Sequence, residues 1–214
     1  FTVNHFENVA INLRDESKII KYLKKNLHKY DLVIVQDFGH GLINNKIADL
    51  IVKESRYLSL NVQTNSTNYG FNYINRKFNR ANVFTLDQNE IKIYARNENP
   101  NYNINLKKLK KELKSDYGFL TLGEKYSIGD GKKKNIKINS LEKNVVDAVG
   151  AGDIFHSFAS LLTILTKEEF LILFLAQISG ALSVKIVGNE RTPSYQEIVN
   201  TFNFYMDSVS GNNL

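Results

Sequence analysis

Hydrophobic and polar residues follow one another along the chain in blocks whose spacing predicts helices and strands in turn. Residues 16–29 repeat isoleucine and leucine at helical spacing, which predicts an amphipathic helix. The apolar run 31–35 is rich in β-branched residues and too short for a helix, so it predicts a buried strand. The same alternation predicts helices at 44–55, 106–113, 154–165, 167–186 and 194–207, strands at 57–61, 81–85 and 118–122, and a hairpin over 126–138.

Strands that alternate with helices predict an α/β fold with a mostly parallel sheet, and ligands of such sheets bind at the carboxyl ends of the strands. We expect one core over residues 1–209, a frayed tail at 210–214, and a capping box from Thr166 to Glu169 before the helix at 167–186. Polar clusters follow four predicted strands, at Asp37, Asn61–Asn65, Asp87–Glu90 and Thr121–Gly123.

Composition narrows the class of protein. A hydrophobic fraction of 43% and a charged fraction of 23% are typical of a globular protein, and no apolar run is long enough to predict a membrane span. The absence of cysteine excludes disulfides, zinc–thiolate sites and thiol catalysis, and it fits a cytoplasmic protein. Net charge is +6, but the basic clusters at 107–111 and 132–134 lack interleaved aromatics, so no nucleic acid partner is expected. A first residue of Phe1 leads us to expect a longer parent protein.

The segment Asp147-Ala-Val-Gly-Ala-Gly-Asp153 is the strongest chemical signal in the sequence. Its glycines allow a tight turn and close backbone approach to a ligand, and the apolar helix that follows makes the turn a helix N-terminus, which binds anions. Asp153 beside an anion site has two interpretations. It either accepts the proton of an attacking hydroxyl in phosphoryl transfer or simply caps the helix. The four histidines lack metal-ligand spacing, and His156 is expected to pack inside the protein.

The same segment resembles the C-terminal signature Asp-Thr-x-Gly-Ala-Gly-Asp-x-Phe of the ribokinase-like, PfkB-type carbohydrate kinases. The resemblance implies a three-layer α/β/α fold and a nucleotide-binding, catalytic C-terminal portion. It implies that Asp153 is the catalytic base and that the amides of Gly150, Ala151 and Gly152 form an anion hole for the transferred phosphate. The strand and turn at 31–41 are similar to those of bacterial heptose kinases, and the resemblance implies a substrate side at Asp37, Gln63 and Asn65.

Further segments match the family in the same order along the chain. Thr85-Leu-Asp-Gln-Asn-Glu90 is similar to the family's Thr-Pro-Asn-x-x-Glu, which implies that Glu90 and Asp87 organise Mg²⁺ through water. The resemblance implies a nucleotide site with ATP at Thr121, Gly123, Glu124, Gln177 and Gly188, and a monovalent cation, K⁺, at Asp147 and Thr192.

Departures from the family pattern leave alternatives open. Ala148 and Val149 stand where the family has threonine, and Asn61-Val-Gln63 stands where heptose kinases have Asp-Pro-Lys, so a lysine is missing. The Gly-Gly sugar motif and the β lid of the family's N-terminal part, which often forms family dimers, are not visible in the sequence. The sequence therefore predicts part of a sugar kinase, with two alternatives. One is a kinase for another small alcohol, and the other is a catalytically degenerate nucleotide-binding or interaction module of a larger sugar-activating protein.

Overall fold

The computed structural model describes residues 10–64 and 72–210 of the chain, in two compact units, residues 1–120 and 121–214. The predicted substrate-side residue Asn65 lies outside the described residues. The same holds for the expected frayed tail, apart from Ser210, which ends the last helix.

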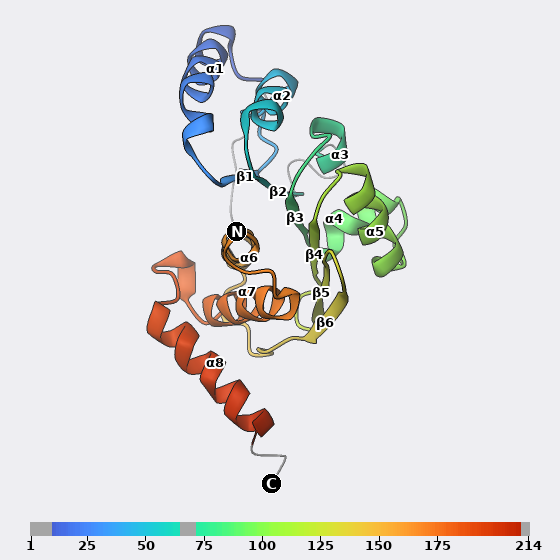
Figure 1. The fold of residues 1–214 in the computed structure, drawn as a ribbon, viewed down its shortest axis with the longest axis vertical. Helices are drawn as coiled ribbons and strands as arrows, with labels where there is room; N and C mark the ends of the chain where they lie inside the picture. The colour runs from blue at the N-terminus through green and yellow to red at the C-terminus, as the bar shows by residue number, and fades with distance from the viewer. Residues whose placement is uncertain (1–9, 65–71, 211–214) are drawn as a thin grey trace, which may run out of the picture. The chain divides into compact units, whose positions relative to one another are not determined.

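The first unit is built on parallel strands that alternate with helices (Figure 1). Strand β1 pairs with β2, β2 with β3 and β3 with β4, each time in parallel. The elements are α1 (Leu13–Asn26), η1 (Leu27–Lys29), β1 (Val33–Asp37), α2 (Asn45–Glu54), β2 (Leu58–Val62), α3 (Ile74–Lys77), β3 (Val83–Leu86), α4 (Gln88–Ala95), α5 (Tyr102–Glu112) and β4 (Tyr117–Thr121).

Local sequence explains why these elements form. Every residue of β2 and β3 is buried, as expected for parallel strands covered on both faces. The asparagine-rich composition supplies helix caps, because the side chains of Asn12, Asn44 and Asn101 accept backbone hydrogen bonds at the N-termini of α1, α2 and α5. The sequence therefore determines both the buried strands and the starts of the helices between them.

The second unit combines an antiparallel hairpin with helices. Helix α7 packs against α6 and against both hairpin strands (Figure 1). Phe174 of α7 stacks on Phe170 and contacts the rings of Phe202 and Tyr205. The elements are β5 (Tyr126–Asp130), β6 (Asn135–Asn139), α6 (Ala151–Leu165), α7 (Glu169–Ser183), η2 (Val187–Asn189) and α8 (Tyr195–Ser210).

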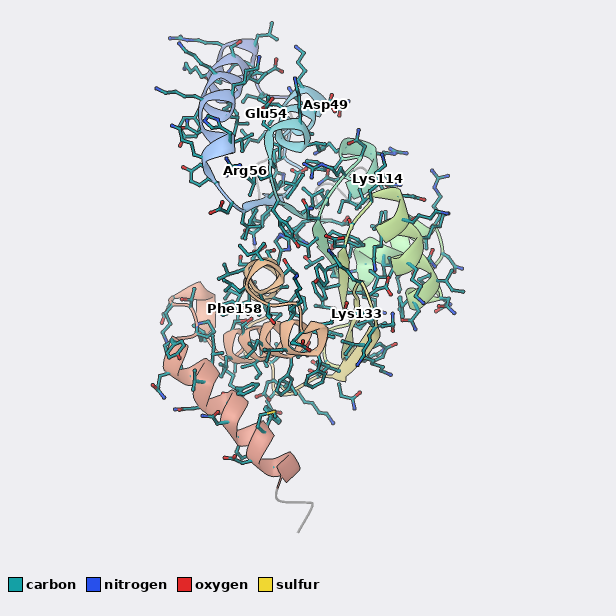
Figure 2. All side chains as sticks on the ribbon, viewed as in Figure 1. Asp49, Glu54, Arg56, Lys114, Lys133 and Phe158 are labelled. Atoms are coloured by element: carbon teal, nitrogen blue, oxygen red, sulfur yellow. The ribbon has the colours of Figure 1, made fainter. Side chains whose placement is uncertain are left out.

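One local prediction in this unit is wrong. Thr166 does not cap α7 in a capping box. It ends α6, and its hydroxyl accepts a hydrogen bond from the amide of Glu168. Helix α7 begins at Glu169, whose carboxylate accepts hydrogen bonds from the amides of Lys133 and Lys134 at 2.8 Å each. Glu169 thus joins the start of α7 to the hairpin turn, where Lys133 is labelled in Figure 2.

Membrane insertion was not expected from the sequence. Across the part of the chain that the structure describes, each helix is too short or too polar to cross a bilayer.

Candidate functional site

The glycine-rich segment forms the N-terminus of α6. Gly150 is the N-cap residue, with a left-handed φ of 78°, and no side chain caps the helix. Asp153 is the third residue of the helix, in its first turn, so it is not the N-cap residue that one interpretation of the sequence required. Amides of a first helical turn have no intrahelical partner, and they attract negative charge. The amide of Ala151 donates to the carbonyl of Ala148 at 3.3 Å, so Gly150 and Gly152 are the better placed of the predicted donors.

Gly152 is a glycine that the fold itself does not require. It lies within a regular right-handed helix, and a methyl group built on it meets no other atom within 4 Å. Gly118 differs, because a methyl group there would lie 2.6 Å from the ring of Phe84. Packing therefore explains Gly118, and a positive φ explains Gly150. Neither explains Gly152, where the space beside the backbone is open.

Asp147 joins the start of the glycine-rich segment to the loop after α7. One carboxylate oxygen accepts a hydrogen bond from the amide of Val149 at 2.9 Å, and the other accepts one from the amide of Gly188 at 2.8 Å. These two backbone donors lower the pKa of the Asp147 carboxyl. The structure thus brings together Asp147 and Gly188, which the sequence had assigned to cation and nucleotide binding.

Thr192 lies in a segment held by an ion pair. The guanidinium of Arg191 donates two hydrogen bonds of 2.8 Å to the two carboxylate oxygens of Glu197, and its Nη1 also donates to the carbonyl of Thr192 at 3.3 Å. The amide and the hydroxyl of Ser194 donate to the same carboxylate. These donors lower the pKa of Glu197 to about 2, with Arg191 the largest cause. Sequence reasoning missed both Arg191 and Glu197.

The residues predicted to bind the nucleotide differ in how exposed they are. Thr121 ends β4, and Gly123 follows in a turn with a positive φ of 56°, where a methyl group built on the glycine would meet no atom within 4 Å. Glu124 is exposed in the same turn. Gln177 is buried, and its side-chain oxygen accepts a hydrogen bond of 2.5 Å from the hydroxyl of Ser127. Gln177 therefore connects α7 to β5, whereas the turn at Gly123 leaves its backbone accessible.

In the first unit, polar groups gather at the carboxyl ends of β1 and β2. Asp37 is 3% exposed, and one of its carboxylate oxygens lies 2.5 Å from the ammonium nitrogen of Lys77. The other oxygen accepts a hydrogen bond from the amide of Gly39. The amide of Gln63 donates to the carbonyl of Asp37, so the two described substrate-side residues are neighbours. Sequence reasoning missed Lys77, which supplies a lysine at this edge from α3.

Asp87 and Glu90 form a capping box at the start of α4. The Asp87 side chain accepts a hydrogen bond from the Glu90 amide, and the Glu90 carboxylate accepts one from the Asp87 amide. The second oxygen of Glu90 accepts a hydrogen bond from the amide of Thr64 at 3.2 Å. Burial raises the pKa of Asp87, although backbone donors oppose the shift. From the sequence, Asp87 and Glu90 were expected to organise Mg²⁺ through water, and their capping box was not predicted.

These carboxylates are compatible with Mg²⁺ held through water. Each carboxylate oxygen has two acceptor sites, so an oxygen that accepts one amide can also accept a metal-bound water. Among residues 10–64 and 72–210, no group of three or more histidine, aspartate and glutamate side chains forms a direct metal cage. Water-mediated binding by Glu90 and Asp87 is therefore the arrangement that the residues fit.

His156 is fully buried in α6, as the sequence predicted. Burial disfavours the charged imidazolium and lowers the pKa of His156 to about 3. The side chain is therefore neutral at physiological pH and belongs to the core.

Comparison with solved structures identifies the fold. Phosphofructokinase-2 from Escherichia coli, solved in complex with potassium, aligns over 91% of this chain and 63% of its own, with a TM-score of 0.75 and 10% identity. Ribokinase from Arabidopsis thaliana, solved with ribose and ATP, aligns over 91% of this chain and 60% of its own, with a TM-score of 0.65 and 18% identity. The chain has the ribokinase-like fold. This confirms the resemblance inferred from the sequence and the expected α/β fold with a mostly parallel sheet.

Curated relatives of this ribokinase-like chain share the bifunctional HldE name. The protein of Campylobacter curvus is 24% identical over 194 residues, which cover 88% of this chain and 40% of the relative. The protein of Aliarcobacter butzleri is 28% identical over 149 residues, which cover 67% of this chain and 30% of the relative. No protein-family model matches the chain. The chain thus spans less than half the length of these relatives.

Proposed function

We propose that this chain is the nucleotide-binding and catalytic portion of an ATP-dependent sugar kinase. The observation that supports the proposal best is Gly152, a helical glycine that neither packing nor backbone conformation requires. An approaching phosphate explains it, because the first turn of α6 offers amides and the positive end of a helix dipole. Asp153, half-buried in the same turn, is then beside the reacting phosphate.

In the proposed reaction, a sugar hydroxyl attacks the terminal phosphorus of ATP. A new oxygen–phosphorus bond forms, the bond to the ADP oxygen breaks, and the hydroxyl proton passes to the Asp153 carboxylate. The amides of Gly150 and Gly152, with that of Ala151 after it leaves Ala148, stabilise the charge on the transferred group. Bound Mg²⁺ would neutralise phosphate charge, and Glu90 and Asp87 would hold its waters.

The turn at Thr121, Gly123 and Glu124 provides accessible backbone for the nucleotide. Gly188 lies in the loop after α7, and its amide joins this loop to Asp147 at the start of the glycine-rich segment. Gln177 supports this region from α7.

Asp37 and Gln63 lie at the carboxyl edge of the first unit's strands, where a sugar is expected to bind. The similarity at 31–41 favours a heptose-like sugar. We place the reaction in the cytoplasm, where ATP is supplied, and we expect further sugar contacts and dimer contacts from the rest of the parent protein.

The test compares three variants of the full-length protein. Gly152→Ala adds only a methyl group that the fold accommodates, so the protein should fold normally while turnover falls by at least about 10²-fold, because the phosphate can no longer approach. Gly180→Ala is the matched control. It also lies within a helix, and its added methyl group meets atoms at 3.8 Å or more. It should retain both stability and turnover.

Asp153→Asn tests the base directly. Turnover should fall by at least about 10²-fold while nucleotide affinity is kept or rises, since the amide removes repulsion from phosphate. Melting temperature, steady-state rate and calorimetric ATP affinity should be measured together. A stable Asp153→Asn protein with normal turnover would contradict the proposal. ATP binding by a wild-type protein that phosphorylates none of a panel of sugars and small alcohols would favour the degenerate interaction module.

A further inference from the structure

Lys77 of α3 brings a positive charge to the carboxyl end of β1, at the edge where α/β sheets bind their ligands. Its ammonium nitrogen lies 2.5 Å from one carboxylate oxygen of Asp37, the residue that ends the strand. The side chain of Asp37 is 3% exposed and that of Lys77 is 17% exposed. The ion pair therefore meets its surroundings mainly at the lysine.

Hydrogen bonds fix the backbone around this pair. The amide of Gln63 donates to the carbonyl of Asp37 at 2.9 Å, which joins the ends of β1 and β2. The side-chain amide of Asn72, a buried residue, donates to the carbonyls of Asp37 and Gln63 at 3.3 and 3.2 Å. The amide of Gly39 donates to the second carboxylate oxygen of Asp37 at 2.9 Å. The pair thus has a set position on the sheet before any ligand binds.

Both members of the pair keep hydrogen-bonding capacity. An ammonium group has three donors, and among residues 10–64 and 72–210 Lys77 uses one of them, with Asp37. Each carboxylate oxygen has two acceptor sites, and each oxygen of Asp37 accepts one hydrogen bond from the described residues. Donor sites on Lys77 therefore remain next to acceptor sites on Asp37.

A sugar hydroxyl is the ligand group that matches such a pair. A hydroxyl both donates and accepts hydrogen bonds, so it can accept from the ammonium of Lys77 while it donates to the carboxylate of Asp37. A phosphate or carboxylate group has acceptors but no donor once it is fully ionised, and the Asp37 carboxylate would repel it. Because the two charges of the pair cancel, the pair favours a neutral ligand group over an anionic one.

We propose that Lys77 and Asp37 together bind one hydroxyl of the sugar, with Lys77 as the donor and Asp37 as the acceptor. Both contacts are charge-assisted hydrogen bonds. A site built in this way rejects an analogue that lacks the hydroxyl, because the enclosed polar groups then lose a partner. Lys77 is therefore a specificity-determining residue, whereas the sequence had assigned Asp37 alone of this pair to the substrate side. The inference rests on the proposed kinase function.

The test is calorimetric binding of aldohexoses, aldoheptoses and their monodeoxy analogues to the full-length protein. For the sugar that binds the wild type most tightly, removal of one particular hydroxyl should weaken binding by at least about tenfold, as for a lost charge-assisted hydrogen bond. Lys77→Met should weaken binding of the intact sugar by a similar factor and should no longer distinguish it from that analogue. Affinity for ATP should stay unchanged.

Leu106→Ala is the control for a purely structural role of Lys77. Leu106 is fully buried in α5, so its truncation should also destabilise the protein, but sugar discrimination should be that of the wild type. If Lys77→Met does not fold, the double variant Asp37→Asn/Lys77→Met takes its place. It leaves no buried charge without a partner, and the new amide oxygen can still accept from Gly39. It should fold and should also fail to distinguish the analogue.

A folded Lys77→Met protein that still discriminates against the analogue would overturn the inference. So would a wild type that binds none of these sugars, or one that tolerates the loss of each hydroxyl equally. Phosphorylation of the same sugars by ATP tests the proposed function separately. Discrimination that depends on Lys77 without any phosphorylation would support the inference and contradict the kinase proposal, and phosphorylation without such discrimination would do the reverse.

Discussion

Lys77 and Asp37 form a buried ion pair in which the ammonium nitrogen lies 2.5 Å from a carboxylate oxygen. The side chain of Asp37 is 3% exposed and that of Lys77 is 17% exposed. Charges removed from water in this way are stable only while each has its partner. The pair therefore holds α3 against the end of β1.

Lys77→Met should lower the free energy of unfolding by about 3 kcal/mol, because it leaves the buried Asp37 carboxylate without its cation. The control is Lys18→Met. Lys18 pairs with Asp15, but both side chains are exposed, at 62% and 47%, so its loss should cost less than about 1 kcal/mol. Urea unfolding of both variants measures the difference. Equal costs would contradict a special role for the Asp37 pair.

Gly131 and Glu169 provide a second prediction. A methyl group on Gly131 would overlap the carboxylate of Glu169, and that carboxylate accepts hydrogen bonds from the amides of Lys133 and Lys134. Gly131→Ala should therefore displace the carboxylate and cost about 2 kcal/mol of stability. In a Glu169→Ala background the same substitution should cost much less. Thermal unfolding of the four proteins forms a double-mutant cycle, and additive effects would show that the two residues act independently.

His156 predicts how stability changes with pH. Its pKa is lowered to about 3 in the folded protein, so between about pH 6.5 and 3 the unfolded chain binds a proton that the native protein does not. Stability must fall as the pH drops through this window. Relative to His156→Leu, the wild type should lose about 2 kcal/mol between pH 7 and pH 5. Urea unfolding at both pH values tests this. A constant difference between the two proteins would mean that the pKa of His156 is the same in the folded and the unfolded chain.

The sequence predicted the elements that carry a clear hydrophobic pattern. The run at 31–35 corresponds to β1, and the helix predicted at 154–165 corresponds to α6, which begins earlier, at Ala151. Helix α4 was not predicted, because its capping box of Asp87 and Glu90 was interpreted as a metal site. The same carboxylates can serve both purposes, and local sequence does not distinguish them.

Interactions between distant residues could not be predicted at the site. Asp37 ends a buried strand, which indicates that a cation must be near it, but Lys77 is 40 residues away along the chain. Asp147 and Gly188 are 41 residues apart, and only the fold brings the carboxylate to that amide. The glycine-rich segment was recognised because its residues are consecutive. The residues that contact this segment in the fold, such as Gly188, are distant along the chain and do not form a motif of consecutive residues.

Val184 limits how the second unit can vary in length. It is the C-cap residue of α7, and its carbonyl accepts the amides of both Val146 and Asp147. One residue inserted within α7 would turn this carbonyl by about 100° around the helix axis and move it by about 1.5 Å. The loop that leads to Asp153 would then lose its anchor. Homologues of this protein should therefore accept insertions in the turns before and after α7, but not within the helix itself.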